Sequence, residues 1–162
     1  KEILFEYNNL HPSEMEKRTE ILKHFLGATG KQLLIEQPFC CDYGYNIRVG
    51  ENFYANMGCT ILDEALVTFG DNVLLAPNVS IYTAGHAVNV AQRVAGWEYA
   101  YPVTVGHNVW IGGNVVILPG VSIGDNSIIG GGSVVTKDIP ANVIAVGNPC
   151  KVIRELTEDE LK

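Results

Sequence analysis

Residues 105–136 read VGHNVWIGGNVVILPGVSIGDNSIIGGGSVVT, and an aliphatic residue recurs in this stretch at every sixth position. The six repeat starts are Val105, Ile111, Ile117, Ile123, Ile129 and Val135. A second set lies four positions after a start and comprises Val109, Val115, Val121, Ser127 and Ser133. Ordinary β-hairpins have a period of two with scattered turn signals, so six hexads in register predict a coil of stacked turns.

The same period occurs upstream in two shorter runs that are separated by two extra residues. Their repeat starts are Val49, Ala55 and Ile61, then Phe69, Leu75 and Ile81. Each hexad predicts one short strand and one corner, and three hexads complete a turn. We expect the repeat starts to face inward and stack, and Gly, Asn and Asp to occupy corners that need positive φ. The predicted fold class is therefore all-β, a parallel β-helix of hexapeptide repeats.

The hexads divide the chain into three segments, and a long loop interrupts the second of them. Residues 1–30 predict an N-terminal helical segment, with a helix over 12–27, and the chain begins without Met as if N-terminal residues were missing. Residues 31–150 form the predicted β-helix, which a long loop over 87–102 interrupts. Residues 151–162 predict a C-terminal cap, helical over its charged part from 155 to 162. A loop as long as 87–102 is usually functional, and it can also pack against a neighbouring subunit.

The composition argues against several partners. The net charge of −7 disfavours broad binding of nucleic acid or a membrane surface, although a local cluster of Lys and Arg could still bind a small anion. No apolar run is long enough to span a membrane. The four cysteines lack metal-binding spacing, so we expect reduced thiols in a cytoplasmic protein.

Two of the four histidines lie within the predicted coil. His86 ends the last hexad before the long loop, where an imidazole could take a proton from an alcohol; its position alone leaves a catalytic and a structural role open. His107 occupies a corner, for which we expect a structural role. A zinc site with three histidine ligands is not expected, because a third histidine is missing.

Polar residues also break the aliphatic pattern at Asn56, Asp63 and Glu64. A cluster of such groups on a coil face could bind a hydroxyl-rich ligand. Equally, Asn56 could belong to a ladder at a corner, and the two acids could simply be solvated.

Four stretches resemble the maltose and galactoside O-acetyltransferases over nearly the whole chain. They are CDYGYNIRVGENFYAN (41–56), ILDEALVTFGDNVLLAPNVSIYTAGH (61–86), VWIGGNVVILPGVSIGDNSIIGGGSVVTKDIP (109–140) and GNPCKVIRE (147–155). The resemblance implies a left-handed coil, acetyl-CoA as the donor, no required metal, and a homotrimer with active sites between neighbouring coils. It also implies direct transfer of the acetyl group to a sugar hydroxyl.

The resemblance assigns His86 as the catalytic base, and Asn56 as a catalytic residue that also contacts the acetyl acceptor. Asp42, Tyr54 and Glu64 match other positions that contact the acetyl acceptor. Galactoside enzymes carry Ser at the position of Asp42 and Asp at that of Glu64, whereas CDYG is the form of maltose-type members. The galactoside specificity is therefore not implied.

The positions that match the family's donor site are Gly113, Gly131, Thr136, Lys137, Lys151 and Arg154. Gly allows close approach of the pantetheine arm, and backbone N–H groups near Gly113 could stabilise an oxyanion. Lys151 and Arg154 match the basic positions that meet the nucleotide phosphates. Trp110 could line the donor channel or belong to the core or an interface.

Two alternatives to a sugar acetyltransferase stay open. A related enzyme could acetylate serine, an antibiotic or a nodulation factor, because all of these enzymes share the hexads and a histidine. A non-catalytic trimeric scaffold would share the coil, but it would be expected to lack His86 or the donor-site positions.

Overall fold

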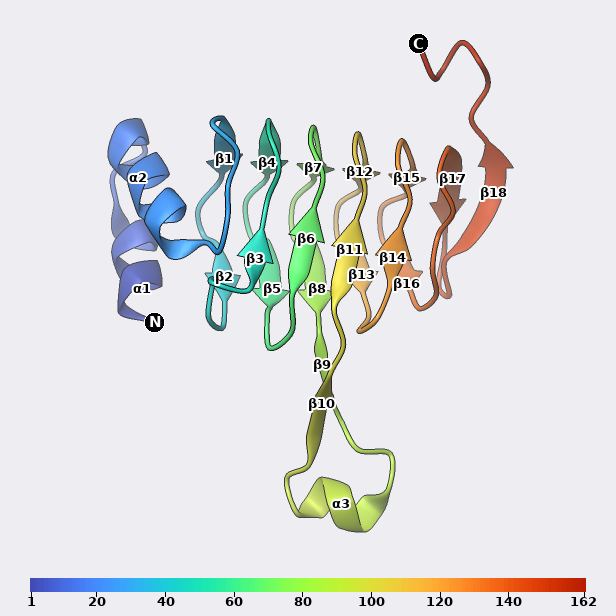
Figure 1. Cartoon of the computed structure of the whole chain (residues 1–162), viewed down its shortest axis with the longest axis horizontal. Coiled ribbons are helices and arrows are strands. Elements are labelled where there is room, and N and C mark those ends of the chain that lie inside the picture. The colour runs from blue at the N-terminus through green and yellow to red at the C-terminus, as the bar shows by residue number, and fades with distance from the viewer.

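The chain folds as a left-handed parallel β-helix with three flat faces, in a computed structural model that describes all 162 residues (Figure 1). Face A is a four-stranded sheet of β3 (Ile47–Arg48), β6 (Val67–Phe69), β11 (Val103–Val105) and β14 (Ser122–Ile123). Face B begins with β1 (Leu33–Ile35), β4 (Phe53–Ala55), β7 (Leu74–Leu75), β12 (Trp110–Ile111) and β15 (Ile128–Ile129), and ends with β17 (Val143–Val146) and β18 (Lys151–Glu155). Face C contains β2 (Cys40–Cys41), β5 (Thr60–Leu62), β8 (Ser80–Tyr82), β13 (Val116–Ile117) and β16 (Val134–Val135).

The interior confirms the predicted hexads. All of the predicted repeat starts are buried, and so is every residue of the set four positions later. Between β11 and β16 a residue pairs with the one eighteen positions on, as Trp110 does with Ile128, so three hexads complete a turn. Parallel pairing stacks like side chains directly above one another, which fills the core without gaps.

The earlier turns are longer, and all of their extra residues lie at one corner. Cys40 pairs with Thr60, twenty residues on, and Thr68 pairs with Thr104, thirty-six residues on. Compared with the regular eighteen, these turns insert two and eighteen extra residues. The insertions fall between face C and face A, at residues 42–46, 63–66 and 83–102, which we call the variable corner.

The corners use asparagine as predicted. Asn52, Asn72, Asn108, Asn126 and Asn142 all have φ between 55° and 62°. Their amides form a ladder, with Nδ2 of each donating to Oδ1 of the next over 2.7–3.0 Å. His107 has the structural contact expected for a corner residue, because its Nδ1 accepts the backbone N–H of Asp71 at 2.9 Å.

Helices α1 (Glu2–Asn9) and α2 (Met15–Phe25) cover the first turn (Figure 1). Tyr7 is buried and its hydroxyl donates to the carbonyl of Ile35. The Arg18 guanidinium is also buried and donates to the same carbonyl and to the Glu36 carboxylate, each at 3.0 Å. None of the helices has the length and apolar character needed to cross a bilayer.

The C-terminal cap is not the predicted helix. Residues 151–155 form β18, which pairs antiparallel with β17, and turns follow over residues 158–161. β18 covers the open edge of β17 and takes up Glu155. Over the rest of the charged run, the Glu160 carboxylate accepts hydrogen bonds from Arg154 and Thr157, which hold this segment in turns.

The predicted loop over 87–102 is part of a projecting hairpin (Figure 1). Strands β9 (Ala84–His86) and β10 (Glu98–Ala100) pair antiparallel, and α3 (Val90–Val94) lies at the far end. The hairpin leaves the coil from the variable corner directly after β8.

Candidate functional site

Face C lies between the two corners that carry most of the candidate residues. Asn56, Gly113 and Gly131 follow strands of face B, at the corner through which the chain enters face C. At the opposite edge, the variable corner carries Asp42 and Glu64. The parallel register places the predicted acetyl-acceptor residues in the early turns and the predicted donor residues in the late turns.

Asp63 organises the variable corner, although the sequence left open whether it was solvated. Its side chain is fully buried, and its carboxylate accepts the backbone N–H groups of Asp42, Tyr43 and Gly44 at 2.8–3.0 Å. A buried carboxylate needs such donors, and here three amides satisfy it. Asp63 therefore holds the backbone of Asp42 in place.

Glu64 lies beside Asp42 and beneath the root of the hairpin. The Thr83 hydroxyl, 3.4 Å from Glu64 Oε2, lies close to the first residue of β9. Partial burial raises the pKa of Glu64, and its hydrogen bond and repulsion with the Asp42 carboxyl raise it further. Lys1 Nζ lies 3.5 Å from Asp42 Oδ1. The two carboxyl groups thus lie near one another at the variable corner, where they could bind a ligand with hydroxyl groups.

His86 lies on β9, three residues beyond Thr83, and more than half of its side chain is exposed. It pairs across the hairpin with Glu98, whose Oε1 is 3.7 Å from His86 Nε2. This distance is longer than a hydrogen bond but allows a charge interaction once the ring is protonated. The carboxylate can thus stabilise the imidazolium that forms when His86 accepts a proton.

Asn56 directly follows β4, and a hydrogen bond to the next residue fixes its side chain. Its Oδ1 accepts the N–H of Met57 at 2.8 Å, while its Nδ2 has no partner within the chain. The free amide therefore points away from that turn and can donate to a ligand. Tyr54 belongs to the outer surface of face B, next to Leu74 in the parallel register.

Gly113 and Gly131 present backbone donors on successive turns. Neither N–H has a partner within the chain. A Cβ on Gly113 would approach the Pro77 carbonyl oxygen to 3.3 Å, and one on Gly131 would approach the Gly113 carbonyl oxygen to 3.2 Å. Glycine thus leaves both amides accessible, as expected for a site where a ligand lies along the backbone.

The remaining donor candidates lie around the late turns. Thr136 and Lys137 follow β16 and are exposed. Lys151 begins β18 opposite Val146 and, like Lys137, forms no ion pair within the chain. These two ammonium groups are therefore free to meet an anion.

Arg154, in contrast, already has an anionic partner. Its two terminal nitrogens donate to the two carboxylate oxygens of Glu160, both at 2.7 Å. This pairing lowers the pKa of Glu160 to about 2. A phosphate that bound Arg154 would have to share it with Glu160 or displace Glu160.

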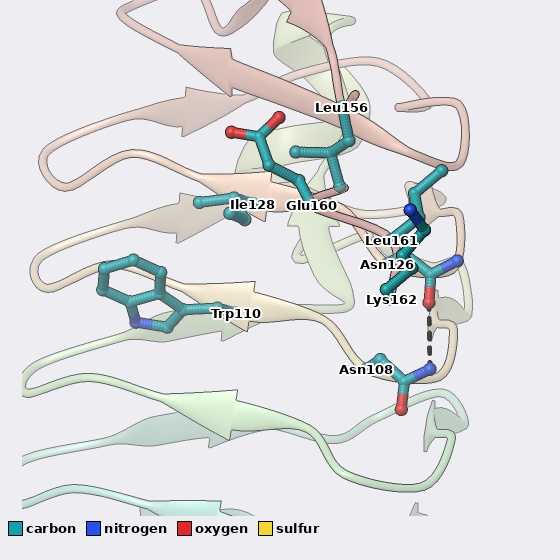
Figure 2. Close-up of a pocket in the computed structure, with 8 residues that line it drawn as sticks. All are labelled: Asn108, Trp110, Asn126, Ile128, Leu156, Glu160, Leu161 and Lys162. Atoms are coloured by element: carbon teal, nitrogen blue, oxygen red, sulfur yellow. Dashed lines mark hydrogen bonds between the residues drawn. The ribbon is translucent and has the colours of Figure 1, made fainter. Parts of the chain in front are cut away.

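The C-terminal turns form one wall of a groove on face B (Figure 2). Its lining consists of Asn108, Trp110, Asn126, Ile128, Leu156, Glu160, Leu161 and Lys162. Trp110 is half exposed here, so it belongs to the surface of face B and not to the core.

All four cysteines are free thiols. Burial, with repulsion from Asp63 and Asp42, raises the pKa of Cys41 to about 12, and burial also raises the pKa of Cys59. Neither thiol has the depressed pKa of a nucleophile. No group of three or more His, Cys, Asp or Glu side chains is arranged to hold a metal ion.

Sequence reasoning missed several contributors to this site. Thr83 lies at an unremarkable position in the hexad that His86 ends, and Glu98 and Glu160 lie outside the hexads. Only the variable corner, the paired hairpin and the C-terminal turn bring them next to Glu64, His86 and Arg154. The signal available for Glu98 was its place in the long loop after His86, but sequence alone does not reveal antiparallel register.

Comparison with known proteins matches this architecture. The bacterial transferase hexapeptide family (six repeats) matches residues 102–137, and the maltose acetyltransferase hexapeptide capping motif matches residues 1–30. Galactoside O-acetyltransferase of Escherichia coli is 52% identical over 98% of this chain and 78% of its own length. The chain belongs to the hexapeptide-repeat family of maltose and galactoside O-acetyltransferases.

Solved structures of the family superimpose closely. A galactoside acetyltransferase in complex with coenzyme A has a TM-score of 0.96 at 52% identity, covering 98% of this chain and 80% of that one. A maltose O-acetyltransferase from Clostridium difficile also has a TM-score of 0.96, at 55% identity, covering 97% of this chain and 84% of that one.

Proposed function

We propose that this protein transfers the acetyl group of acetyl-CoA to a hydroxyl of a maltose-, glucose- or galactoside-like sugar. The observation that carries the proposal is the arrangement around face C. A histidine with a carboxylate partner, His86 with Glu98, lies on the hairpin that leaves the variable corner, and the same corner carries Asp42 and Glu64. The unpaired amides of Gly113 and Gly131 lie along the opposite edge. Relatives named galactoside and maltose O-acetyltransferases support the acetyl transfer.

His86 acts as the general base in this proposal. It takes the proton of the acetyl acceptor's hydroxyl while that oxygen bonds to the thioester carbonyl carbon. The C–S bond then breaks, and the leaving thiolate takes the proton from the imidazolium. Glu98 stabilises the imidazolium in between, more strongly when substrates have displaced water. The acetyl group passes directly between substrates, with no acetylated enzyme.

Gly113 and, from a neighbouring coil, Asn56 serve the developing oxyanion in this proposal, because within one coil the two residues lie two strands apart on face B. The Nδ2 group of Asn56 and the N–H of Gly113 have no partners in the chain, so both are ready to donate. Fixed donors of this kind need no reorganisation as charge develops on the carbonyl oxygen. Asn56 also contacts the acetyl acceptor, together with Asp42, Tyr54 and Glu64.

The donor lies along the late turns in this proposal. Gly131 and Thr136 border the pantetheine arm, and Lys137, Lys151 and Arg154 meet the nucleotide phosphates. The residues fit such a ligand because two ammonium groups are unpaired and the glycine amides are open. The proposed anion site is local, which is compatible with the net charge of −7 of the whole chain.

The active form is proposed to be a homotrimer in the cytoplasm, with sites between neighbouring coils. The hairpin supports this assembly because it projects from its own coil with exposed apolar side chains: Val88, Val90, Val94 and Trp97. Apolar groups held away from the parent core are well suited to cover a neighbour. The free cysteines suit a reducing compartment.

The test is a thiol-release assay with acetyl-CoA and a panel of maltose, glucose, a galactoside, serine and chloramphenicol. We expect CoA release with at least one sugar and none with serine or chloramphenicol. Turnover with serine or chloramphenicol but with no sugar would show that the acetyl acceptor is not a sugar. Absence of turnover with any hydroxyl compound would favour the scaffold.

A further inference from the structure

Two tyrosines next to Asp42 form an exposed aromatic surface to which no role is yet assigned. Tyr43 and Tyr45 are 47% and 61% exposed, and their ring centroids are 5.4 Å apart at an angle of 39°. Neither phenolic hydroxyl has a hydrogen-bond partner within the chain. Aromatic rings of this size usually bury their faces and pair their hydroxyls, so a ligand that offers both contacts would suit them.

The backbone beneath these rings is rigid. Asp63 accepts the N–H groups of Tyr43 and Gly44, and Ile47 donates its N–H to the Gly44 carbonyl at 2.9 Å. Gly44 has φ of +83°, and a Cβ there would come within 2.5 Å of the Phe25 ring. The rings are thus presented on a turn that α2 and the buried carboxylate hold in one conformation, which lowers the entropy cost of binding.

The neighbouring groups indicate what this surface binds. Asp42 precedes Tyr43 directly, and the carboxyl group of Glu64 lies near that of Asp42. A sugar ring has polar hydroxyl edges and an apolar face of C–H groups. Carboxyl groups match the edges, tilted aromatic rings match the face, and the two kinds of group lie on consecutive residues here.

We propose that Tyr43 and Tyr45 form a second sugar subsite, which binds a pyranose ring linked to the one that is acetylated. This inference rests on the proposed function, since it places the reacting ring at Asp42 and Glu64. It assigns the enzyme a linked-sugar substrate class, in which the second ring stacks on the tyrosines and its hydroxyls meet theirs. A monosaccharide gains nothing from this subsite.

The test compares maltose with glucose at saturating acetyl-CoA, using kcat/KM from thiol release. We expect Tyr45→Ala to lower kcat/KM about tenfold for maltose, the scale of one aromatic contact, and less than about twofold for glucose. Tyr43→Ala should have the same selectivity. Tyr45→Phe is the matched control, because it keeps the ring and should retain most of the activity with maltose. The KM for acetyl-CoA should not change in any variant.

Equal losses with both sugars, or no loss with either, would overturn the subsite. A change in the oligomeric mass of Tyr45→Ala, measured by light scattering, would show a subunit contact and overturn it as well. If Tyr45→Ala melts well below the parent, Tyr45→Ser and Tyr43→Ala decide between these outcomes. A wild-type protein that acetylates no sugar would refute the proposed function instead, and so the two failures are distinguishable.

Discussion

The early and late turns of the coil differ at a single corner. From β12 to β16 the turns contain eighteen residues, and face C connects to face A through a short, regular corner. The early turns add residues at this corner alone, while their inward positions stay in register. Extra residues there can carry acids and a histidine without disturbing the stack of aliphatic side chains. The comparison teaches that the repeat supplies the support, and its interruptions supply the groups that we propose to contact the acetyl acceptor.

Replacing the two coil histidines tests this division most sharply. His86→Ala should lower kcat by about 10²–10⁴-fold, because it removes the general base, and should leave the Kd for acetyl-CoA unchanged. His107→Ala is the matched control in a regular turn. It removes one acceptor for the Asp71 N–H and should cost about 1 kcal/mol of stability with little change in kcat. Steady-state kinetics measure the loss of kcat in each variant, and thermal melts measure the loss of stability. Equal losses of kcat in the two variants would contradict the division between supporting turns and reacting groups.

Substituting one aspartate in an early corner and one in a late corner compares how much the two regions contribute to stability. Asp63→Ala leaves three buried or partly buried N–H groups without their carboxylate, and we expect a loss of about 3 kcal/mol in the free energy of unfolding. Asp138→Ala removes a carboxylate that accepts only the Ser122 N–H at an exposed corner, and the expected loss is about 1 kcal/mol. Urea unfolding followed by circular dichroism gives both values. A cost for Asp138→Ala as large as that for Asp63→Ala would contradict the central role of Asp63.

Substituting Gly113 tests the proposal that the late turns bind the acetyl donor. Gly113→Ala should lower kcat/KM for acetyl-CoA at least about tenfold by covering the free amide that serves the oxyanion, and it should leave the KM for the sugar unchanged. Gly112→Ala differs, since its Cβ would come within 2.6 Å of the Gly131 backbone nitrogen and should destabilise the coil. An increased sugar KM in Gly113→Ala would place the acetyl acceptor in the late turns.

The smallest expected effect concerns pH. The folded pKa of Glu64 is raised by burial and by Asp42, so the folded state holds this proton more tightly than the unfolded chain does. Its contribution to stability is therefore present below the pKa of an unfolded glutamate, about 4.3, and is lost as the pH rises through the raised folded pKa. Glu64→Gln should remove this decline. Thermal melts across this pH range measure it, and parallel curves for the two proteins would show that the carboxyl pair does not matter.

The hexads made much of the fold predictable, because burial of Ile111 and its counterparts follows from position alone. The helix expected over 155–162 failed because Glu155 joins β18 at the open edge of β17, and because the Glu160 carboxylate binds Arg154 and Thr157 and holds the rest in turns. For the site, Asn56 and Glu64 were visible as polar breaks in the repeat. The neighbours of His86 and Arg154 were not, since Glu98 and Glu160 reach them through an antiparallel hairpin and a turn whose register no periodic signal records.

By itself, the sequence determined a three-faced coil, because only inward stacking of every sixth residue satisfies so regular a pattern. Its likeness to known acetyltransferases also marked His86 and the glycines near the donor. Tertiary structure alone decided that Asp63 is buried beneath Asp42 and Tyr43, that a carboxylate faces His86, and that Arg154 is already paired. These contacts join residues from different turns, and their geometry depends on how insertions of two and eighteen residues fold at one corner, which a six-residue period does not specify.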